Sequence, residues 1–471
     1  ILATGTYLRG RIILGETMYD SGPNGQRPAM ALSDSLRAAG LRLMRFKTGT
    51  PARVDRRTLD LEKTAVQNGD PAAPAFSFLT TEMRAEQTPC YLTYTNEATH
   101  AVIRANLHRA PMANGVIEGT GPRYCPSVET KIARFPDKER HQLFLEPEGL
   151  HTNEIYVQGM STSLPTDVQE AFLTTIPGLE HARIMRPGYA IEYDCLDPLQ
   201  LTPTLAVKHI AGLYSAGQAN GTSGYEEAAA QGLIAGINAV CDITGREPLI
   251  LRRSDGYIGV LIDDLVTKGT DEPYRMMTSR AEYRLILRQD NADLRLTPIG
   301  RAMGLVTDER WARFTAKRDA IERTVQQLKE TQVNPSTETE ARLAAADIAP
   351  LRVPMTIFAL LSREGDYAQL AALFDLPPLA DDVREEVEIM ARYDGYIRKQ
   401  EEQIARMERL ESRRIPDGLD YSAITSLRLE AAEKLAAIRP RSIGQAARIS
   451  GVSPADISVL LVYLEKERQS Q

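Results

Sequence analysis

The chain has 471 residues, of which 43% are hydrophobic and 25% are charged, a composition typical of a folded globular protein. This length predicts about three domains. A formal net charge of −7 argues against indiscriminate binding to nucleic acid. A local basic face remains compatible with that charge, because salt screens charges beyond about 10 Å. No apolar run approaches the roughly 20 residues that a membrane-spanning helix needs, so no membrane segment is expected.

The cysteines exclude two kinds of site. Cys90, Cys125, Cys195 and Cys241 lie far apart, and no pair has the CxxC spacing. The sequence therefore predicts neither a zinc site nor a redox-active dithiol. So few cysteines in a chain of this size are typical of a reducing compartment.

The first fifty residues have an α/β pattern. The opening ILATGTYL resembles the end of a buried strand that enters a turn, so we expect an upstream part of this domain to be missing, with any targeting segment. A helix is predicted at 29–39 and a strand at 41–46. The basic residues between Arg42 and Arg57 favour a solvated, charge-balanced face, and a rim that contacts phosphate is the alternative.

Residues 51–124 change character and are predicted to form an insertion. Several prolines interrupt this stretch, a short strand is expected at 90–95, and a helix is expected at 96–107. Residues 141–200 then show short strands that end in turn residues, with a short helix at 166–174.

The loop 121–135 contains one thiol among basic residues. Arg123 lies two residues before Cys125, and Lys131 and Arg134 lie after it at roughly helical spacing. Positive neighbours lower the pKa of a thiol. A thiolate there could add to C6 of a pyrimidine ring and activate C5, which is nucleophilic catalysis. A small buried apolar cysteine is the structural alternative.

The stretch 213–236 organises the rest of the chain. An apolar run at 210–214 predicts a strand, a cluster of small residues follows, and a helix is predicted at about 226–239. A strand, glycine-rich turn and helix bring backbone N–H groups against a ligand, here the flat polar part of a cofactor. An ordinary strand-to-helix turn is the alternative.

After residue 245 the strand patterns fade, and helices are predicted at 257–266, 307–332, 382–413, 421–437, 442–450 and 453–469. Apolar residues repeat along the helix at 382–413, which favours a packing surface, either internal or for a partner helix. The last two helices have the outline of a helix-turn-helix DNA reader. The second is too apolar to read a groove, which favours a helical packing unit.

Two segments of the helical part are less regular. Residues 278–297 would place Arg280, Arg284 and Arg288 on one face if they formed a helix. Residues 333–350 are predicted to be a polar, alanine-rich connection.

Long motifs spread over nearly the whole chain carry a family resemblance: TGTYLRG, RFKTGTPAR, GVIEGTGPRYCPSVETKIARF, FLEPEGL, TSLPTDVQ, RPGYAIEYD, AGQANGTSGYEEAAAQG, EPYRMMTSRAEYRL, RQDNADLRLT and SIGQAARISGVSPADIS. They resemble the MnmG/GidA family, the flavoprotein subunit of the enzyme that modifies the wobble uridine of tRNA. The resemblance implies an α/β flavoprotein: a Rossmann-like FAD domain incomplete at its N-terminus, an inserted α+β domain and an all-α C-terminal domain. The implied boundaries are 1–50 and 201–245 for the second and last parts of the FAD domain, 51–124 for the insertion, 125–200 for a mixed region with a second insertion, and 246–471 for the helical domain.

The resemblance also implies two sites. The flavin-side loop of the family matches 216–227, where Gln218 is the expected flavin contact, with Gly217, Gly221, Gly224 and Glu226 as further cofactor contacts. The nicotinamide-linked stretch matches 121–135, with cofactor contacts at Gly121, Pro122, Tyr124, Lys131 and Arg134. The catalytic cysteine of the family matches Cys125, and its nearby arginine matches Arg123.

The implied reaction installs a carboxymethylaminomethyl or aminomethyl group at C5 of the wobble uridine. In the family, methylenetetrahydrofolate carries the one-carbon unit, FAD and NADH supply the redox step, and glycine or ammonia supplies nitrogen. The C-terminal helices match those that dock the GTPase MnmE and help to hold tRNA. The resemblance thus implies a cytoplasmic homodimer within a heterotetramer, without a membrane anchor.

The sequence departs from the family pattern at its start. The family's amino-terminal GxGxxG loop, which holds the FAD diphosphate, and its upstream cysteine are absent from these residues. We therefore expect the chain alone to bind FAD poorly, and a catalytically inactive scaffold for tRNA and the GTPase is one alternative. Another is the folate-dependent tRNA uridine methyltransferase, which shares the flavin domain but lacks a long helical tail. A disulfide reductase is disfavoured because no cysteines are close in sequence.

Overall fold

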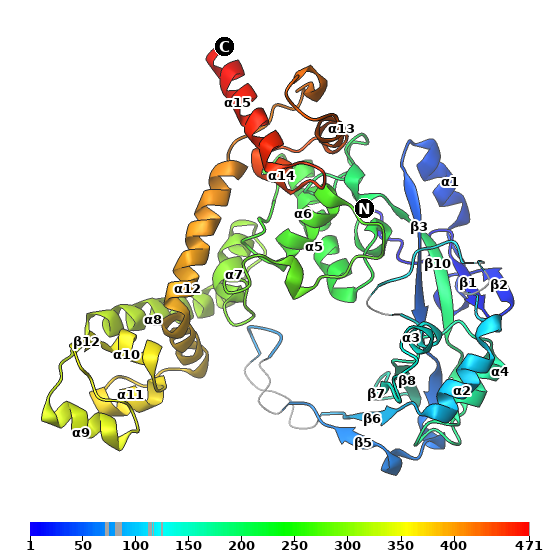
Figure 1. The fold of residues 1–471 in the computed structure, drawn as a ribbon, viewed down its shortest axis with the longest axis horizontal. Helices are drawn as coiled ribbons and strands as arrows, with labels where there is room; N and C mark the ends of the chain where they lie inside the picture. The colour runs from blue at the N-terminus through cyan, green and yellow to red at the C-terminus, as the bar shows by residue number, and fades with distance from the viewer. Residues whose placement is uncertain (71–74, 81–86, 112–114, 116, 124–125, 471) are drawn as a thin grey trace. The chain divides into compact units, whose positions relative to one another are not determined.

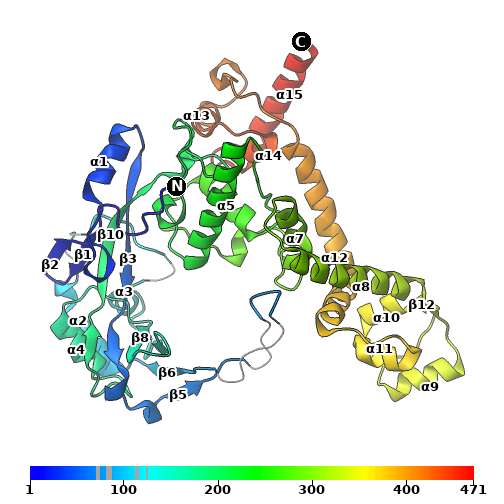
Figure 2. The same ribbon diagram turned by 180° about the vertical axis from the view of Figure 1, so that it is seen from behind.

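The computed structural model describes residues 1–470 apart from 71–74, 81–86, 112–114, 116 and 124–125. Over these residues the chain divides into a first unit, Ile1–Pro248 with Gly269–Arg275, and a second unit, Leu249–Lys268 with Met276–Gln471. Figure 1 and the reverse view in Figure 2 label the elements of each unit. Among the helices of the described residues, none combines the length and apolar character that crossing a membrane would require.

An antiparallel sheet of the first unit places basic residues opposite acidic ones. Its strands lie in the order β2 (Thr17–Asp20), β1 (Arg11–Leu14), β10 (Tyr189–Leu196) and β3 (Leu43–Thr50). In the register of β10 against β3, Glu192 lies opposite Lys47 and Asp194 lies opposite Arg45. The strand predicted at 41–46 instead begins at Leu43 and ends at Thr50. The helix predicted at 29–39 is confirmed as α1 (Met30–Ala38).

The second sheet of this unit is antiparallel throughout and is covered by helices. Its strands lie in the order β5 (Ala65–Gln67), β6 (Cys90–Tyr94), β7 (Gln142–Pro147), β8 (Glu154–Gln158), β4 (Arg53–Asp55) and β9 (Ile184–Arg186). The associated helices are α2 (Glu97–Ala105), α3 (Val128–Arg134) and α4 (Thr166–Leu173), and α2 lies beside α4 (Figure 1). Leu145, Ile103 and Phe172 are buried in their shared core. The Asn96 side chain caps α2 by accepting from the N–H of Thr99 at 3.0 Å.

The predicted turn-to-helix element is present, but the strand predicted before it is wrong. Residues 210–213 form a turn and a bend, and Tyr214 forms an isolated bridge with Ala206. Gly212 has a φ of +73°, which breaks the extended backbone of the apolar run. The turn and the helix that follow are η6 (Gly217–Asn220) and α5 (Tyr225–Thr244).

The second unit is mainly helical. Its elements are α6 (Tyr257–Lys268), α7 (Ala292–Ala302), α8 (Asp308–Glu330), α9 (Thr337–Ala345), α10 (Ile357–Arg363), α11 (Tyr367–Phe374), α12 (Asp381–Glu411), α13 (Leu429–Ile438), α14 (Ile443–Arg448), α15 (Pro454–Ser470) and the paired short strands β11 (Gln332–Val333) and β12 (Met355–Thr356). Helices α8 to α11 lie around one end of α12, and α13 to α15 lie around its other end (Figures 1 and 2).

Several helix signals in the sequence are confirmed. The Thr307 side chain accepts from the N–H of Arg310 at 3.3 Å and caps α8 as predicted. On α12, Val383 and Val387 are buried in a core shared with α8 and α10, and Met390 packs against it. This part of the apolar stripe is therefore an internal packing surface.

Three segments of the second unit differ from the sequence predictions. The helix predicted at 421–437 begins only at Leu429, after a separate 3-10 turn at Tyr421–Ala423. Residues 278–297 do not form one helix: a single 3-10 turn at Thr278–Arg280 is followed by loops, and α7 begins at Ala292. The three arginines therefore do not share a helical face. The connection predicted at 333–350 contains α9, which Ser336 caps by accepting from the N–H of Thr339 at 3.1 Å.

A buried network of charges joins elements of the second unit. Arg253, only 8% exposed, donates to Asp263 at 3.1 Å, to Asp264 at 2.8 Å and to Glu282 at 2.7 Å. Arg448 donates to both carboxylate oxygens of Asp263, at 2.7 and 2.8 Å. The network therefore holds α14 against α6 through charge-assisted bonds.

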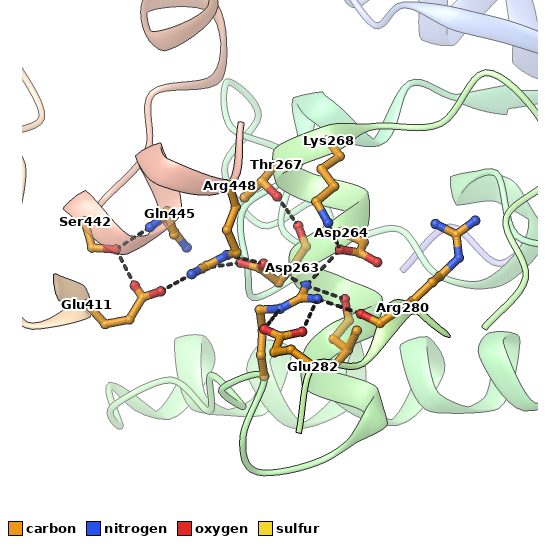
Figure 3. Close-up of polar contacts among 12 residues, drawn as sticks. Asp263, Asp264, Thr267, Lys268, Arg280, Glu282, Glu411, Ser442, Gln445 and Arg448 are labelled. Carbon is orange, nitrogen blue, oxygen red and sulfur yellow. Dashed lines mark hydrogen bonds and ion pairs between the residues drawn. The ribbon is translucent and has the colours of Figure 1, made fainter. Parts of the chain in front are cut away.

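The end of α12 belongs to the same network. Glu411 accepts from Arg448 and from the Ser442 hydroxyl, and that hydroxyl also caps α14 by accepting from the N–H of Gln445 at 3.0 Å. Figure 3 shows Arg448 between Asp263 and Glu411. One arginine thus links three helices.

Another buried carboxyl group of this unit, outside that network, has an altered pKa. Glu386 of α12 accepts from Arg288 at 2.7 Å and interacts with Asp290. Burial, and then the hydrogen bond with Asp290, raise the pKa of Glu386 to about 8, although Arg288 opposes the shift. A glutamate in an unfolded chain has a pKa of about 4.3. The folded state therefore binds more protons than the unfolded state between these values, and this group lowers stability as pH rises from about 4 to about 8.

Glu386→Gln should remove this contribution, because the amide stays neutral. We expect the variant to gain stability relative to the parent protein as pH rises from 5 to 9, with the largest difference above pH 8. Urea unfolding midpoints across that range measure the effect, with Glu402→Gln, at an exposed position of the same helix, as the control. A constant difference across the range would contradict the prediction.

Candidate functional site

A polar cavity lies beside β3 in the first unit. Its volume is about 400 Å³, and its basic lining residues are Lys47, Arg123 and Arg134. Hydroxyl groups of Ser127 and Thr130 and the stretch 161–163 also line it. In the part of the chain that the structure describes, Glu272 is the acidic lining residue. The cavity wall is therefore rich in donors and positive charge.

The stretch before the predicted catalytic loop is fixed against β3. The N–H of Lys47 donates to the carbonyl of Thr120 at 3.0 Å, and the N–H of Thr120 donates to the carbonyl of Arg45 at 3.3 Å. A Cβ at Gly119 would lie 2.8 Å from the Phe46 carbonyl group, so only glycine allows this approach. The backbone contact determines where the following residues meet the cavity.

Lys47 is buried between carboxylates. Burial lowers the pKa of its ammonium, while Glu129 and Glu192 oppose that shift. Glu192 accepts from the N–H groups of Glu118 and Gly119, both at 2.6 Å. Glu129, on α3, accepts from the N–H of Ser163 at 3.1 Å. The two carboxylates are thus held by the backbone that surrounds the cavity.

The structure brings together part of the predicted nicotinamide-linked stretch. Gly121, Pro122, Arg123 and Arg134 line the cavity. The ammonium of Lys131 instead donates to the carbonyl of Gly159 at 2.9 Å, and Lys131 is not part of the lining. Tyr124 and Cys125 lie outside the described residues.

The predicted flavin-side loop forms a hydrogen-bonded, glycine-containing turn. Gly217 and Gly221 have φ values of +78° and +80°, which glycine adopts without strain. The amide of Asn220 donates to the carbonyl of Ser215 at 2.6 Å and to the side chain of Gln231 at 3.0 Å. These buried bonds tie the turn to α5.

The turn also holds polar atoms that lack internal partners. Within the described residues, the Ser215 and Ser223 hydroxyls and the side-chain amide oxygen of Asn220 are buried without a hydrogen-bond partner. Gly224 caps α5 without a side-chain bond, Glu226 is exposed and Glu227 pairs with Arg275 at 3.3 Å. Buried polar atoms of this kind require a partner, so the turn is suited to a polar ligand.

One short segment connects the turn with the cavity. The N–H of Tyr274 donates to the carbonyl of Gly221 at 2.8 Å, and the N–H of Ser223 donates to the carbonyl of Tyr274 at 3.2 Å. Glu272, two residues before Tyr274, lines the cavity. On the other side, Gly221 lies against the Phe46 ring, next to Lys47 on β3. The two predicted sites are therefore neighbours.

Sequence reasoning missed the importance of Lys47 and Glu272. Lys47 was one of several basic residues, and the structure pairs its neighbours Arg42, Arg45, Arg53 and Arg57 with carboxylates. A signal was available: Arg45 and Lys47 are two residues apart on β3, and the acidic residues opposite them are two residues apart on β10. This matching spacing predicts pairs of opposite charge across the two strands. No comparable signal distinguished Glu272.

Comparisons with known proteins agree along the whole chain. The family model of Glucose inhibited division protein A matches residues 1–247, and the C-terminal helical domain and helical bundle of the tRNA modifying enzyme MnmG/GidA match 308–401 and 403–471. The MnmG of Caldicellulosiruptor saccharolyticus is 57% identical over all of this chain and 75% of its own length. The MnmG of Bacillus subtilis is 55% identical over 99% of this chain and 75% of its own length. Both are named tRNA uridine 5-carboxymethylaminomethyl modification enzyme.

A solved structure extends the agreement to three dimensions. Aquifex aeolicus GidA in its form II crystal is 45% identical, with a TM-score of 0.88 over 98% of this chain and 74% of its own. The fold is that of an α/β flavoprotein with a helical C-terminal part, as predicted. The chain belongs to the MnmG/GidA family.

Proposed function

We propose that this chain takes part in tRNA modification and installs a carboxymethylaminomethyl or aminomethyl group at C5 of the wobble uridine. The observation that carries the proposal is the 55–57% identity, over essentially the full chain, to relatives that bear the name of this activity. The basic cavity beside the glycine-containing turn supplies a physical setting for it.

FAD is the cofactor that fits the turn at 216–227. Its flavin has a flat edge of alternating donors and acceptors, and the turn offers buried polar atoms without internal partners and close backbone approach. Gln218 would contact that edge, with Gly217, Gly221, Gly224 and Glu226 around it. When bound, FAD and NADH would supply the redox step, and methylenetetrahydrofolate would supply the one-carbon unit.

Cys125 is the proposed nucleophile. Its thiolate would add to C6 of the uracil ring and make C5 reactive toward the one-carbon unit. Arg123 and Arg134, which line the cavity, would favour the thiolate and bind anionic groups of the nicotinamide cofactor or of RNA. Gly121, Pro122, Tyr124 and Lys131 complete the proposed cofactor stretch.

The helical C-terminal part is proposed to bind tRNA and the GTPase MnmE, in a cytoplasmic heterotetramer around a homodimer. Exposed apolar side chains on its last helices, Leu429 and Val462, suit a protein partner. Replacing both with glutamate should reduce co-purification of MnmE; unchanged co-purification would exclude these two positions from the interface.

The experiment that tests the proposal is a nucleoside assay. Purified chain is incubated with MnmE, FAD, NADH, methylenetetrahydrofolate, glycine and tRNA that lacks the modification. Mass spectrometry of the digested tRNA should show the carboxymethylaminomethyl uridine. If the protein as purified shows no visible flavin absorbance and the assay gives no modified nucleoside, the scaffold alternative is favoured. 5-Methyluridine as the product would identify the methyltransferase. The helical matches at 308–401 and 403–471 count against the methyltransferase.

A further inference from the structure

We propose that His100, His141 and Thr95 form a proton-sensitive clasp, which holds α2 against the second sheet at neutral pH and releases it in acid. His100 lies on α2, and His141 directly precedes β7. The centroids of the two rings are 5.4 Å apart. The inference goes beyond the proposed function, because neither histidine lines the cavity beside β3.

The Thr95 hydroxyl connects the two histidines. It accepts from the backbone N–H of His141 at 2.8 Å, and its oxygen lies 2.8 Å from Nε2 of His100. Thr95 is 1% exposed, and among the described residues its hydroxyl proton has no other acceptor, so the hydroxyl donates to His100. Nε2 of His100 is therefore the unprotonated nitrogen of a neutral imidazole.

The ring of His141 is also suited to the neutral form. Its Nε2 is buried and, within the part of the chain that the structure describes, has no hydrogen-bond partner. A charged imidazole carries a proton on both nitrogens. Protonation of His141 would therefore bury an N–H donor and a positive charge without an acceptor, which is costly. His100 is itself only 2% exposed, so neither ring can become charged in place without this cost.

Cations surround the ring of His141. Lys131 on α3 and Lys138 in the loop after it act on this ring, and so would His100 once charged. Burial first, and then these positive groups, lower the pKa of His141. The first proton on the pair therefore makes the second less favourable.

The charges near His100 have the same overall effect. Burial first, and then Arg104 on the same helix, lower the pKa of His100. Glu97 opposes this shift, but its carboxylate is paired with Arg104. Helix α4 also packs on α2, and its Asp167 is paired with Arg109. The acidic groups near the clasp are thus already engaged by arginines.

The direction of the pH effect follows from the lowered pKa values. A histidine in an unfolded chain has a pKa of about 6.5, so below that pH the open clasp binds more protons than the closed one. Acid then favours opening by up to about tenfold per histidine for each pH unit, down to the pKa of the closed state. Glu146 on β7 acts in the opposite direction: burial raises its pKa, so its protonation stabilises the closed form.

Release of α2 would reach the candidate site through α3. Ile103 of α2 shares a buried core with Val128 and Ile132 of α3. Helix α3 ends at Arg134, which lines the cavity. Opening of the clasp therefore removes packing from the helix that carries a residue of the site.

The test is amide hydrogen exchange of the full 471-residue chain at pH 7.5 and at pH 5.5, followed by mass spectrometry and corrected for the intrinsic exchange rates. Peptides that cover α2 should lose at least tenfold protection at the lower pH. Peptides from β10, which belongs to the other sheet of the same unit, should change less than threefold.

Two substitutions remove the titrating groups and keep the packing. His141→Phe retains an aromatic ring and replaces the nitrogen that has no partner among the described residues. His100→Gln retains an acceptor for the Thr95 hydroxyl. In the double variant, α2 should lose less than threefold protection over the same pH change. His151→Gln, at an exposed position between β7 and β8, is the matched control and should behave like the parent.

The proposal is overturned if α2 of the parent loses no more protection than β10, or if the folded double variant loses as much as the parent. If the double variant does not fold, NMR of the histidine-labelled parent decides. Both rings should be neutral at pH 7.5 and titrate below pH 6.5, with the proton of His100 on Nδ1. A neutral His100 protonated at Nε2, or titration of both rings above pH 6.5, would contradict the clasp. These measurements involve neither tRNA nor flavin, so they are independent of the proposed function.

Discussion

Replacing Cys125 with serine should reduce the formation of modified uridine roughly a thousandfold or more, the order of loss that follows removal of a covalent nucleophile. A serine hydroxyl has nearly the size of the thiol, but it does not ionise near neutral pH. The attack on C6 of the base would therefore lose its nucleophile, while the surrounding loop keeps its volume. The measurement is the rate of product formation by mass spectrometry under single-turnover conditions.

The control is another cysteine of the same unit. Burial raises the pKa of Cys90, so its thiol stays protonated at neutral pH, and Cys90→Ser should keep nearly full activity. Full activity of Cys125→Ser would remove the thiol from the mechanism.

Replacing Arg253 with methionine should lower the free energy of unfolding of the chain by about 3–5 kcal/mol, the usual effect of breaking a buried ion pair by removing one partner. Arg253 is 8% exposed and donates to Asp263, Asp264 and Glu282. Asp264 is almost fully buried and would keep Lys268 as its cation, but Glu282 and Asp263 would each lose a charge-assisted bond. Urea denaturation followed by circular dichroism measures the effect.

An exposed arginine of the same unit provides the comparison. Arg406 pairs with Glu402 one turn earlier on α12, with both side chains mostly in solvent. Arg406→Met should change the unfolding free energy by less than about 1 kcal/mol, because water screens such pairs. Equal effects of the two substitutions would show that burial of the network contributes nothing to stability.

Local signals in the sequence predicted the elements that depend on local interactions. The cap at Thr307 and the apolar stripe of α12 identify helices because both act within a few turns of the chain. The segment 278–297 had helical spacing of its arginines, but long-range partners decided its structure. Arg288 bonds to Glu386, 98 residues away, and the backbone turns before α7. The run 210–214 failed as a strand because Gly212 takes a left-handed conformation.

The candidate site was predictable to the extent that it is contiguous. Arg123 and Arg134 flank the predicted nucleophile in the sequence, and both line the cavity. Lys47 and Glu272 come from distant segments and reach the cavity through the register of β3 and through the pairing of Tyr274 with the turn. Lys131 is basic and lies in the same 121–135 stretch as Arg123 and Arg134. Its ammonium nevertheless donates to the backbone carbonyl of Gly159, which sequence spacing alone does not reveal.

The pairing of Lys47 with Glu192 across β3 and β10 has a consequence for how this family tolerates change. Side chains alternate between the faces of a strand, so inserting or deleting one residue in β3 would turn the ammonium to the opposite face. The same insertion or deletion would move Phe46, whose backbone lies against Gly119, and would disrupt that close backbone contact. Length variation among natural relatives should therefore accumulate in surface loops and be missing from residues 43–50, even though that strand contains no proposed nucleophile.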